Sequence, residues 1–116
     1  MLNADDFDAL ATRALARIPP RFRRLMRNVV IVVESEPRER GLLGLYQGRP
    51  LTERGVGEGF QLPDQITIYQ GPHERMAQNP AHLEQVVAET IWHEIAHHFG
   101  MDEKQVRRAE RRRERR

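Results

Sequence analysis

The sequence predicts an α+β fold in which a short mixed sheet packs on one long helix. Residues 29–33 form an uninterrupted run of β-branched side chains, and residues 65–69 alternate polar with apolar side chains; both patterns are typical of strands. From Asn79 to about Phe99, apolar residues recur at helical spacing after a capping residue and a proline. Few strands beside long helices favour the α+β class.

The N-terminal segment predicts two helices. Asn3 is a suitable N-cap, and the apolar residues that follow it recur at three- and four-residue spacing as far as Ile18. The pair Pro19-Pro20 ends this first helix. Because proline is favoured at the first helical position, Pro20 also begins a short second helix that we expect to reach Met26.

The strands are expected to differ in burial. The aliphatic run 29–33 predicts a strand buried on both faces, whereas the alternation over 65–69 predicts a half-exposed strand that ends at Gly71-Pro72. Residues 42–46 are a candidate for a further short strand. Glycine and proline between residues 48 and 59 predict a long loop, and we expect it to border a substrate cleft.

Length and composition indicate one domain, residues 1–106, followed by a charged tail, residues 107–116. The chain of 116 residues has no cysteine, which excludes disulfides and thiolate metal sites. The acidic N-terminus does not resemble a signal peptide, and the longest aliphatic run is too short to span a bilayer. We therefore expect a cytoplasmic protein without membrane contact, whose oligomeric state the sequence leaves open.

The tail carries most of the positive charge. It contains seven arginines and two glutamates, a local charge of +5 against +2 for the whole chain, so residues 1–106 are net acidic. Arginines in such number neutralise phosphates, but no aromatic side chains for base stacking are interleaved with them. Nucleic-acid binding is accordingly disfavoured, and a solvated tail is the simpler interpretation.

The strongest functional signal is His93-Glu94-x-x-His97 within the long predicted helix. Residues four apart lie on one helix face, so both imidazoles can ligate the same zinc ion. Glu94 can then reach a water held by that metal. Gly100 allows the chain to turn out of the helix.

A carboxylate follows that turn at Asp102 or Glu103, and either residue is a candidate for a third protein ligand. Two histidines, one carboxylate and an open fourth position are typical of a catalytic zinc site, whereas structural sites are closed by four protein ligands.

The extended pattern His93-Glu94-x-x-His97-x-x-Gly100-x-x-Glu103 resembles that of the zincin metallopeptidases. In length and layout the chain is similar to the minimal zincin-like family of small bacterial proteins, over most of residues 20–106. The other stretches that carry the similarity are residues 42–46, 63–69 and 97–100.

The resemblance implies a zincin-like fold and a role for each motif residue. His93 and His97 would ligate Zn²⁺, and Glu94 would act as general base in the hydrolysis of a peptide or protein substrate. The position of Glu103 holds His or Asp in zincins of the extended pattern, so Glu103 is preferred to Asp102 as the third ligand. No methionine turn follows the motif, which disfavours the metzincin branch.

Two other functions compete with a peptidase. His-x-x-x-His with a later ligand also resembles a metal-dependent bacterial endoribonuclease, but that family has a third histidine and lacks the glutamate, so Glu94 and Glu103 argue against it. Alternatively, the chain is a catalytically silent module that binds RNA or a protein partner. The sequence does not name the substrate or prove activity.

The remaining histidines and tyrosines are expected to have structural roles. His98 is predicted to pack on the apolar side of the helix, and a packing role is preferred to oxyanion binding for both tyrosines. The histidines outside the motif are predicted to lie at the surface. The two histidines are His73 and His82, and the two tyrosines are Tyr46 and Tyr69.

Overall fold

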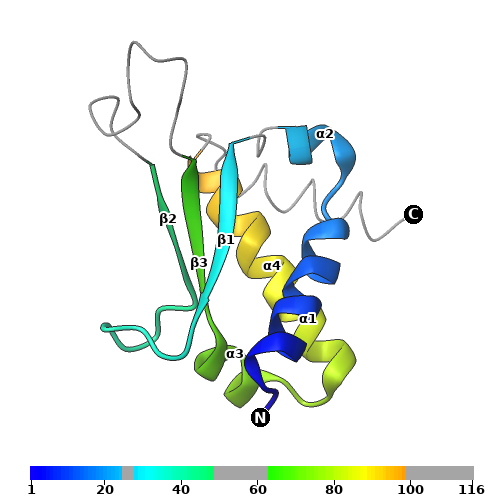
Figure 1. Ribbon diagram of the computed structural model, residues 1–116, viewed down its shortest axis with the longest axis vertical. Coiled ribbons are helices and arrows are strands. Elements are labelled where there is room, and N and C mark those ends of the chain that lie inside the picture. The colour runs from blue at the N-terminus through cyan, green and yellow to red at the C-terminus, as the bar shows by residue number, and fades with distance from the viewer. Residues whose placement is uncertain (25–27, 49–62, 99–116) are drawn as a thin grey trace.

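The computed structural model describes residues 1–24, 28–48 and 63–98. It confirms the predicted α+β class: a small mixed sheet lies against helices (Figure 1). The metal-ligand candidates Glu103 and Asp102, and the tail from residue 107, lie outside the described residues. The elements are α1 (Ala4–Ala16), α2 (Pro20–Arg23), β1 (Val29–Glu34), β2 (Gly44–Gln47), β3 (Asp64–Tyr69), α3 (Gln70–Met76) and α4 (Pro80–His98).

The sheet has the order β1-β3-β2. Strand β3 pairs in parallel with β1, where Ile31 lies opposite Ile66. It pairs antiparallel with β2, where Tyr46 lies opposite the same Ile66. The last of the described strands is therefore the central one, and β2 forms an edge of the described sheet.

This order reverses the burial expected of the two predicted strands. In β3, predicted to be half exposed, Ile66, Thr67 and Ile68 are all buried, and Thr67 is only 3 % exposed. In β1, predicted to be buried on both faces, Val30 is 41 % exposed. Both predictions were wrong because the position of a strand in the sheet, and not only its side-chain pattern, decides how much of it is covered.

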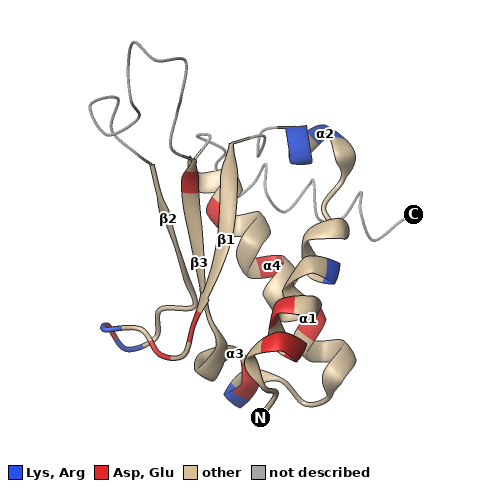
Figure 2. Ribbon diagram, viewed as in Figure 1, with Lys and Arg blue, Asp and Glu red and all other residues tan. Residues whose placement is uncertain are grey.

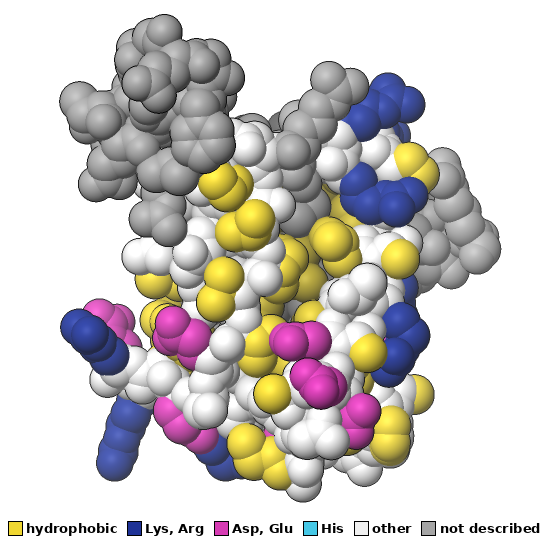
Figure 3. All heavy atoms as spheres, in the orientation of Figure 1, with side chains coloured by type: hydrophobic (Ala, Val, Ile, Leu, Met, Phe, Trp, Pro, Cys, Tyr) yellow, Lys and Arg dark blue, Asp and Glu magenta, His cyan; other side chains and the backbone are white. Residues whose placement is uncertain are grey.

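A groove between β1 and α1 accounts for the partial exposure of the aliphatic run. It has a volume of about 530 Å³, and Val29, Ile31 and Val33 line its strand side. Leu15 and Asp8 line the helix side. The space-filling view shows hydrophobic atoms gathered between sheet and helices on this face (Figure 3).

Helix α4 lies between the sheet and α1 and forms the centre of the core (Figure 1). Its apolar face buries Val87, Ile91 and Ile95, as the helical periodicity predicts. Trp92 packs edge to face against Phe22, which lies in the short helix α2. Within the described part of the chain, no helix is both long and apolar enough to cross a lipid bilayer.

Both predicted N-caps are confirmed. The Asn3 side chain accepts a hydrogen bond from the Asp6 N–H at 2.8 Å, and the Asn79 side chain accepts one from the His82 N–H at 2.8 Å. These contacts satisfy backbone donors that have no partner within the first helical turn. Helix α3 was not predicted: the chain passes from β3 directly into it, although Gly71-Pro72 indicated only the end of a strand.

Figure 2 marks the charged positions along the chain, with acidic residues in α1 and basic residues in α2. Acidic residues occupy the first turn of α1, where the helix dipole favours them. Arg13 of α1 and Arg17, the C-cap of that helix, both pair with Glu84 of α4, at 2.9 and 3.6 Å. Because these side chains are partly exposed, the pairs contribute little to stability and mainly align the two helices.

His73 was predicted to lie at the surface, and this prediction is wrong. It is fully buried. Its Nδ1 lies 2.7 Å from the carbonyl oxygen of Tyr69, and its Nε2 lies 2.7 Å from Thr90 Oγ1. Burial lowers the pKa of His73 below its ordinary value, only partly opposed by the bond to Tyr69. The ring is therefore neutral near pH 7, and Nδ1 carries the proton because a carbonyl only accepts.

We expect the folded state to lose stability in mild acid because of His73. In the unfolded chain the pKa of this group has its ordinary value of 6.5, whereas in the folded chain it is lower. The stabilisation is therefore complete above pH 6.5, and it declines below this value because the unfolded chain takes up the proton more readily. Urea unfolding between pH 7.5 and 5.5 measures this, and one proton corresponds to a slope of about 1.4 kcal/mol per pH unit.

The matched control is His73→Gln, whose amide keeps polar atoms at this buried position but does not titrate. Its stability should depend less steeply on pH over the same range, whatever its absolute value. Identical pH dependence in the two proteins would show that His73 is not the group responsible.

Candidate functional site

The C-terminal half of α4 carries the three motif residues that the structure describes. His93 and His97 project from one face of the helix, with ring centroids 6.1 Å apart and ring planes at 81°. Two imidazoles that share one zinc ion at Zn–N distances of about 2.0–2.1 Å have centroids roughly 5–6 Å apart. A small rotation of the side chains is therefore enough for both rings to reach one ion.

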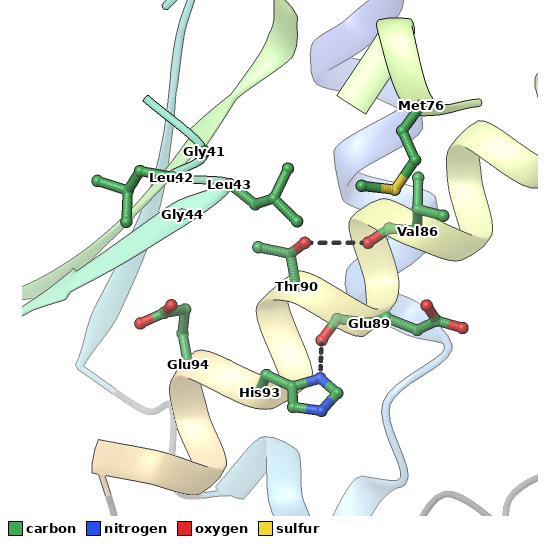
Figure 4. A pocket seen from close by; sticks show the side chains of 10 residues that line it. All are labelled: Gly41, Leu42, Leu43, Gly44, Met76, Val86, Glu89, Thr90, His93 and Glu94. Carbon is green, nitrogen blue, oxygen red and sulfur yellow. Dashed lines mark hydrogen bonds between the residues drawn. The ribbon is translucent and has the colours of Figure 1, made fainter. Parts of the chain in front are cut away.

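The orientation of His93 suits metal binding. Its Nδ1 lies 2.9 Å from the backbone carbonyl oxygen of Glu89, one turn earlier in the helix (Figure 4). Because that carbonyl only accepts, Nδ1 carries the proton, and in the neutral ring the lone pair is on Nε2. A backbone carbonyl commonly fixes the tautomer of a metal-binding histidine in this way.

Glu94 extends from α4 toward the strands (Figure 4). Its carboxylate accepts a hydrogen bond from the backbone N–H of Tyr46 in β2. Burial raises the pKa of Glu94 above its ordinary value, and the bond to Tyr46 and the charges of His97 and His93 oppose this shift without cancelling it. A carboxyl group with a raised pKa is a stronger base than an exposed glutamate, as a proton acceptor in hydrolysis requires.

The hydrogen bond to Glu94 depends on a close approach of β2 to α4. Gly44, the first residue of β2, is buried against Thr90. A Cβ atom at Gly44 would lie 2.7 Å from Thr90 Cγ2 and 3.1 Å from the carbonyl oxygen of Thr67. Glycine is therefore required here, because any side chain would separate the strand from the helix.

A cavity of about 390 Å³ adjoins these residues. His93 and Glu94 lie at one end of it, and the side chains of Leu43, Met76 and Val86 make much of the remaining wall apolar (Figure 4). Its strand side is formed by residues 41–44, which precede the predicted long loop; the loop itself lies largely outside the described residues.

Tyr46 and His98 join the ends of β2 and α4. The Tyr46 hydroxyl donates to Asp64 Oδ2 at 2.9 Å. The two aromatic rings stack with centroids 3.8 Å apart and planes at 16°, and His98 Nε2 lies 4.0 Å from the same Asp64 oxygen. These contacts agree with the packing role expected for Tyr46, whereas His98 stacks on Tyr46 but remains exposed and does not lie on the buried apolar side of α4. Asp64 is a partner that the sequence did not indicate.

Comparison with known proteins identifies the family. Residues 26–113 match the family described as "zincin-like metallopeptidase", which covers well over half of the chain. The chain belongs to the zincin-like metallopeptidase family. The resemblance inferred from the His-Glu motif is thereby confirmed at the level of the family.

A solved structure supports the fold. A conserved hypothetical protein from Thermo thermophilus is 26 % identical and superposes with a TM-score of 0.53, over 84 % of this chain and 94 % of that one. Its description assigns no activity. No curated protein matches the chain significantly.

Proteins of the zincin-like family generally bind zinc, and the residues described here fit that metal in part. His93 and His97 supply two nitrogen donors on one helix face. Within residues 1–24, 28–48 and 63–98, no third His, Asp or Glu completes a metal-binding group. The predicted third ligand, Glu103, and its neighbour Asp102 lie outside these ranges and stay predictions.

Sequence analysis missed Gly44 and Thr90, which position β2 over the site. A glycine at the start of a short strand, and a threonine one turn before His93, are the only signals the sequence contains for them. Neither signal indicates that the two residues are in contact, because that contact joins elements that are far apart in the chain.

Replacing Gly44 by alanine should destabilise the protein. The new methyl group meets Thr90, which a buried hydrogen bond to His73 holds in place, and a backbone oxygen that cannot move independently. Overpacking of this kind costs about 1–3 kcal/mol. Chemical unfolding of Gly44→Ala measures the loss.

Gly48→Ala is the matched control, since a Cβ atom there comes no closer than 3.7 Å to another side chain. Its stability should stay near that of the parent protein. Equal effects of the two substitutions would mean that the approach of β2 to α4 is not tight at Gly44.

Proposed function

We propose that this chain is a zinc-dependent metallopeptidase in which Glu94 is the general base and His93 and His97 hold the metal. The observation that supports this most strongly is the environment of Glu94. Its half-buried carboxyl group borders a cavity beside His93 and accepts a hydrogen bond from an edge strand. Family membership supports the same class of reaction.

The proposed reaction assigns Glu94 two proton transfers. Bound zinc supplies a Lewis acid that makes water nucleophilic near neutral pH. The Glu94 carboxylate takes a proton from the attacking water and delivers it to the leaving nitrogen of the peptide. Because burial raises the pKa of Glu94, its carboxylate holds that proton more readily than an exposed glutamate would.

The strands provide a place for an extended substrate. In the antiparallel pairing with β3, Leu43 directs its carbonyl oxygen to the Tyr69 N–H. Because backbone groups alternate in direction along a strand, those of Gly44 face away from β3. We infer that a peptide or protein substrate adds to this side of β2, with a side chain in the adjoining apolar cavity.

Zinc content tests the metal site. We expect about one zinc per chain in protein prepared without chelator, and loss of the metal in the double variant His93→Ala, His97→Ala, because two of its donors are removed. Elemental analysis gives the stoichiometry.

His82→Ala is the matched control, since His82 accepts a bond from the Gln78 N–H at the start of α4, well before the motif. It should keep its zinc. Glu103→Ala should weaken zinc binding more than Asp102→Ala, which decides between the two candidate ligands. Absence of zinc from the parent protein even after zinc is supplied would exclude the proposed metal site.

Hydrolysis tests the role of Glu94. Glu94→Gln keeps the shape of the side chain but removes its basicity, so it should retain zinc and lose roughly 100- to 10,000-fold in kcat on a peptide library. Mass spectrometry of the cleaved library measures this and identifies the preferred residues.

Glu84→Gln is the matched control on the same helix, because the Glu84 carboxylate pairs with Arg13 and lies outside the residues that line this cavity. It should cleave at a rate close to the parent. A zinc-loaded parent protein that cleaves no peptide would contradict the proposal, and cleavage of RNA in a parallel assay would favour an endoribonuclease instead.

A further inference from the structure

We propose that the buried His73 is a positioning residue for Glu94. It acts through Thr90, whose orientation sets how closely the edge strand β2 approaches α4. The inference rests on the proposed role of Glu94, but the contacts that carry it belong to the fold and are measurable without any substrate.

The first contact fixes the side chain of Thr90. His73 Nδ1 donates to the Tyr69 carbonyl oxygen, so in the neutral ring Nε2 accepts a hydrogen bond from the Thr90 hydroxyl, whose Oγ1 lies 2.7 Å away. Thr90 Oγ1 also lies 3.1 Å from the carbonyl oxygen of Val86, the usual weaker bond of a helical threonine. The shorter bond to His73 holds the hydroxyl toward α3.

The second contact is made by the other branch of the same side chain. With its hydroxyl held by His73, Thr90 presents its Cγ2 methyl group to Gly44. Both residues are buried, and the methyl group lies close to where a Cβ of Gly44 would be. The first residue of β2 therefore packs directly against this methyl group.

The third contact carries the separation between β2 and α4 from Gly44 to Glu94. Tyr46 lies two residues after Gly44 in β2, and Glu94 lies four residues after Thr90 in α4. Two strand residues advance about 6.6 Å and four helical residues about 6.0 Å, so the strand and the helix remain in step over this distance. The separation set at Gly44 therefore recurs at the hydrogen bond from Tyr46 to Glu94.

Removal of the His73 ring should release this arrangement. Without an acceptor at Nε2, the shorter of the two bonds that hold the Thr90 hydroxyl is lost, and the longer bond to the Val86 carbonyl alone directs the methyl group at Gly44 less firmly. Strand β2 then moves relative to α4, and the N–H of Tyr46 loses contact with the Glu94 carboxylate.

The test is amide hydrogen exchange followed by NMR in His73→Leu, with His73→Gln as the conservative variant. The amide of Tyr46 reports the bond to Glu94, and the amide of Leu45, which faces β3, is the internal control. In His73→Leu we expect exchange of Tyr46 to accelerate about tenfold relative to Leu45, the factor that loss of one hydrogen bond implies. The Gln side chain can accept from Thr90, so His73→Gln should restore most of the protection.

Parallel acceleration of both amides, or of neither, in His73→Leu would overturn the proposal, because a purely structural histidine affects the whole strand. If His73→Leu does not fold, Thr90→Ser takes its place: it keeps the hydroxyl and removes the methyl group. Unchanged protection of Tyr46 in Thr90→Ser would overturn the proposal as well. A protein that passes this test but cleaves no peptide would refute the peptidase function alone.

Discussion

The candidate site depends on the close packing of the edge strand β2 on helix α4. Gly44 allows the approach, since any Cβ there would collide with the methyl group of Thr90. Two residues later, the backbone of Tyr46 reaches the Glu94 carboxylate. The same packing closes one wall of the cavity next to His93. A single contact between strand and helix therefore determines where Glu94 lies, how far it is buried and which residues line the cavity beside it.

Two ionisable groups lie beside this contact: His73 is fully buried and Glu94 is half-buried. The cost of removing each group from water is offset in a different way. His73 is neutral, and both of its ring nitrogens have hydrogen-bonding partners, so little of the cost of burying a polar group remains. Glu94 accepts one backbone N–H and lies near two histidines, yet burial still raises its pKa. The first arrangement stabilises a fixed geometry, whereas the second leaves Glu94 with a raised pKa, as the proposed proton transfers require.

Helix α4 serves the core and the candidate site at once. Ile91 and Ile95 are fully buried in the core, while His93 and Glu94, between them in the chain, face the cavity. In so small a domain no separate scaffold carries the motif, and the helix is held on both sides by the sheet and by α1 (Figure 1). Changes in core packing along α4 will therefore reach the site directly.

The sequence by itself determined the local features: the caps at Asn3 and Asn79, the long amphipathic helix, and the placement of His93 and His97 on one face of it. These follow from helical periodicity and from hydrogen bonds between residues close in the chain. Only the tertiary structure decided that β3 is central and β1 is not, that His73 is buried, and that Gly44 rests on Thr90. Those features arise from contacts between residues 17 or more positions apart, whose pairing the pattern within any one segment does not encode.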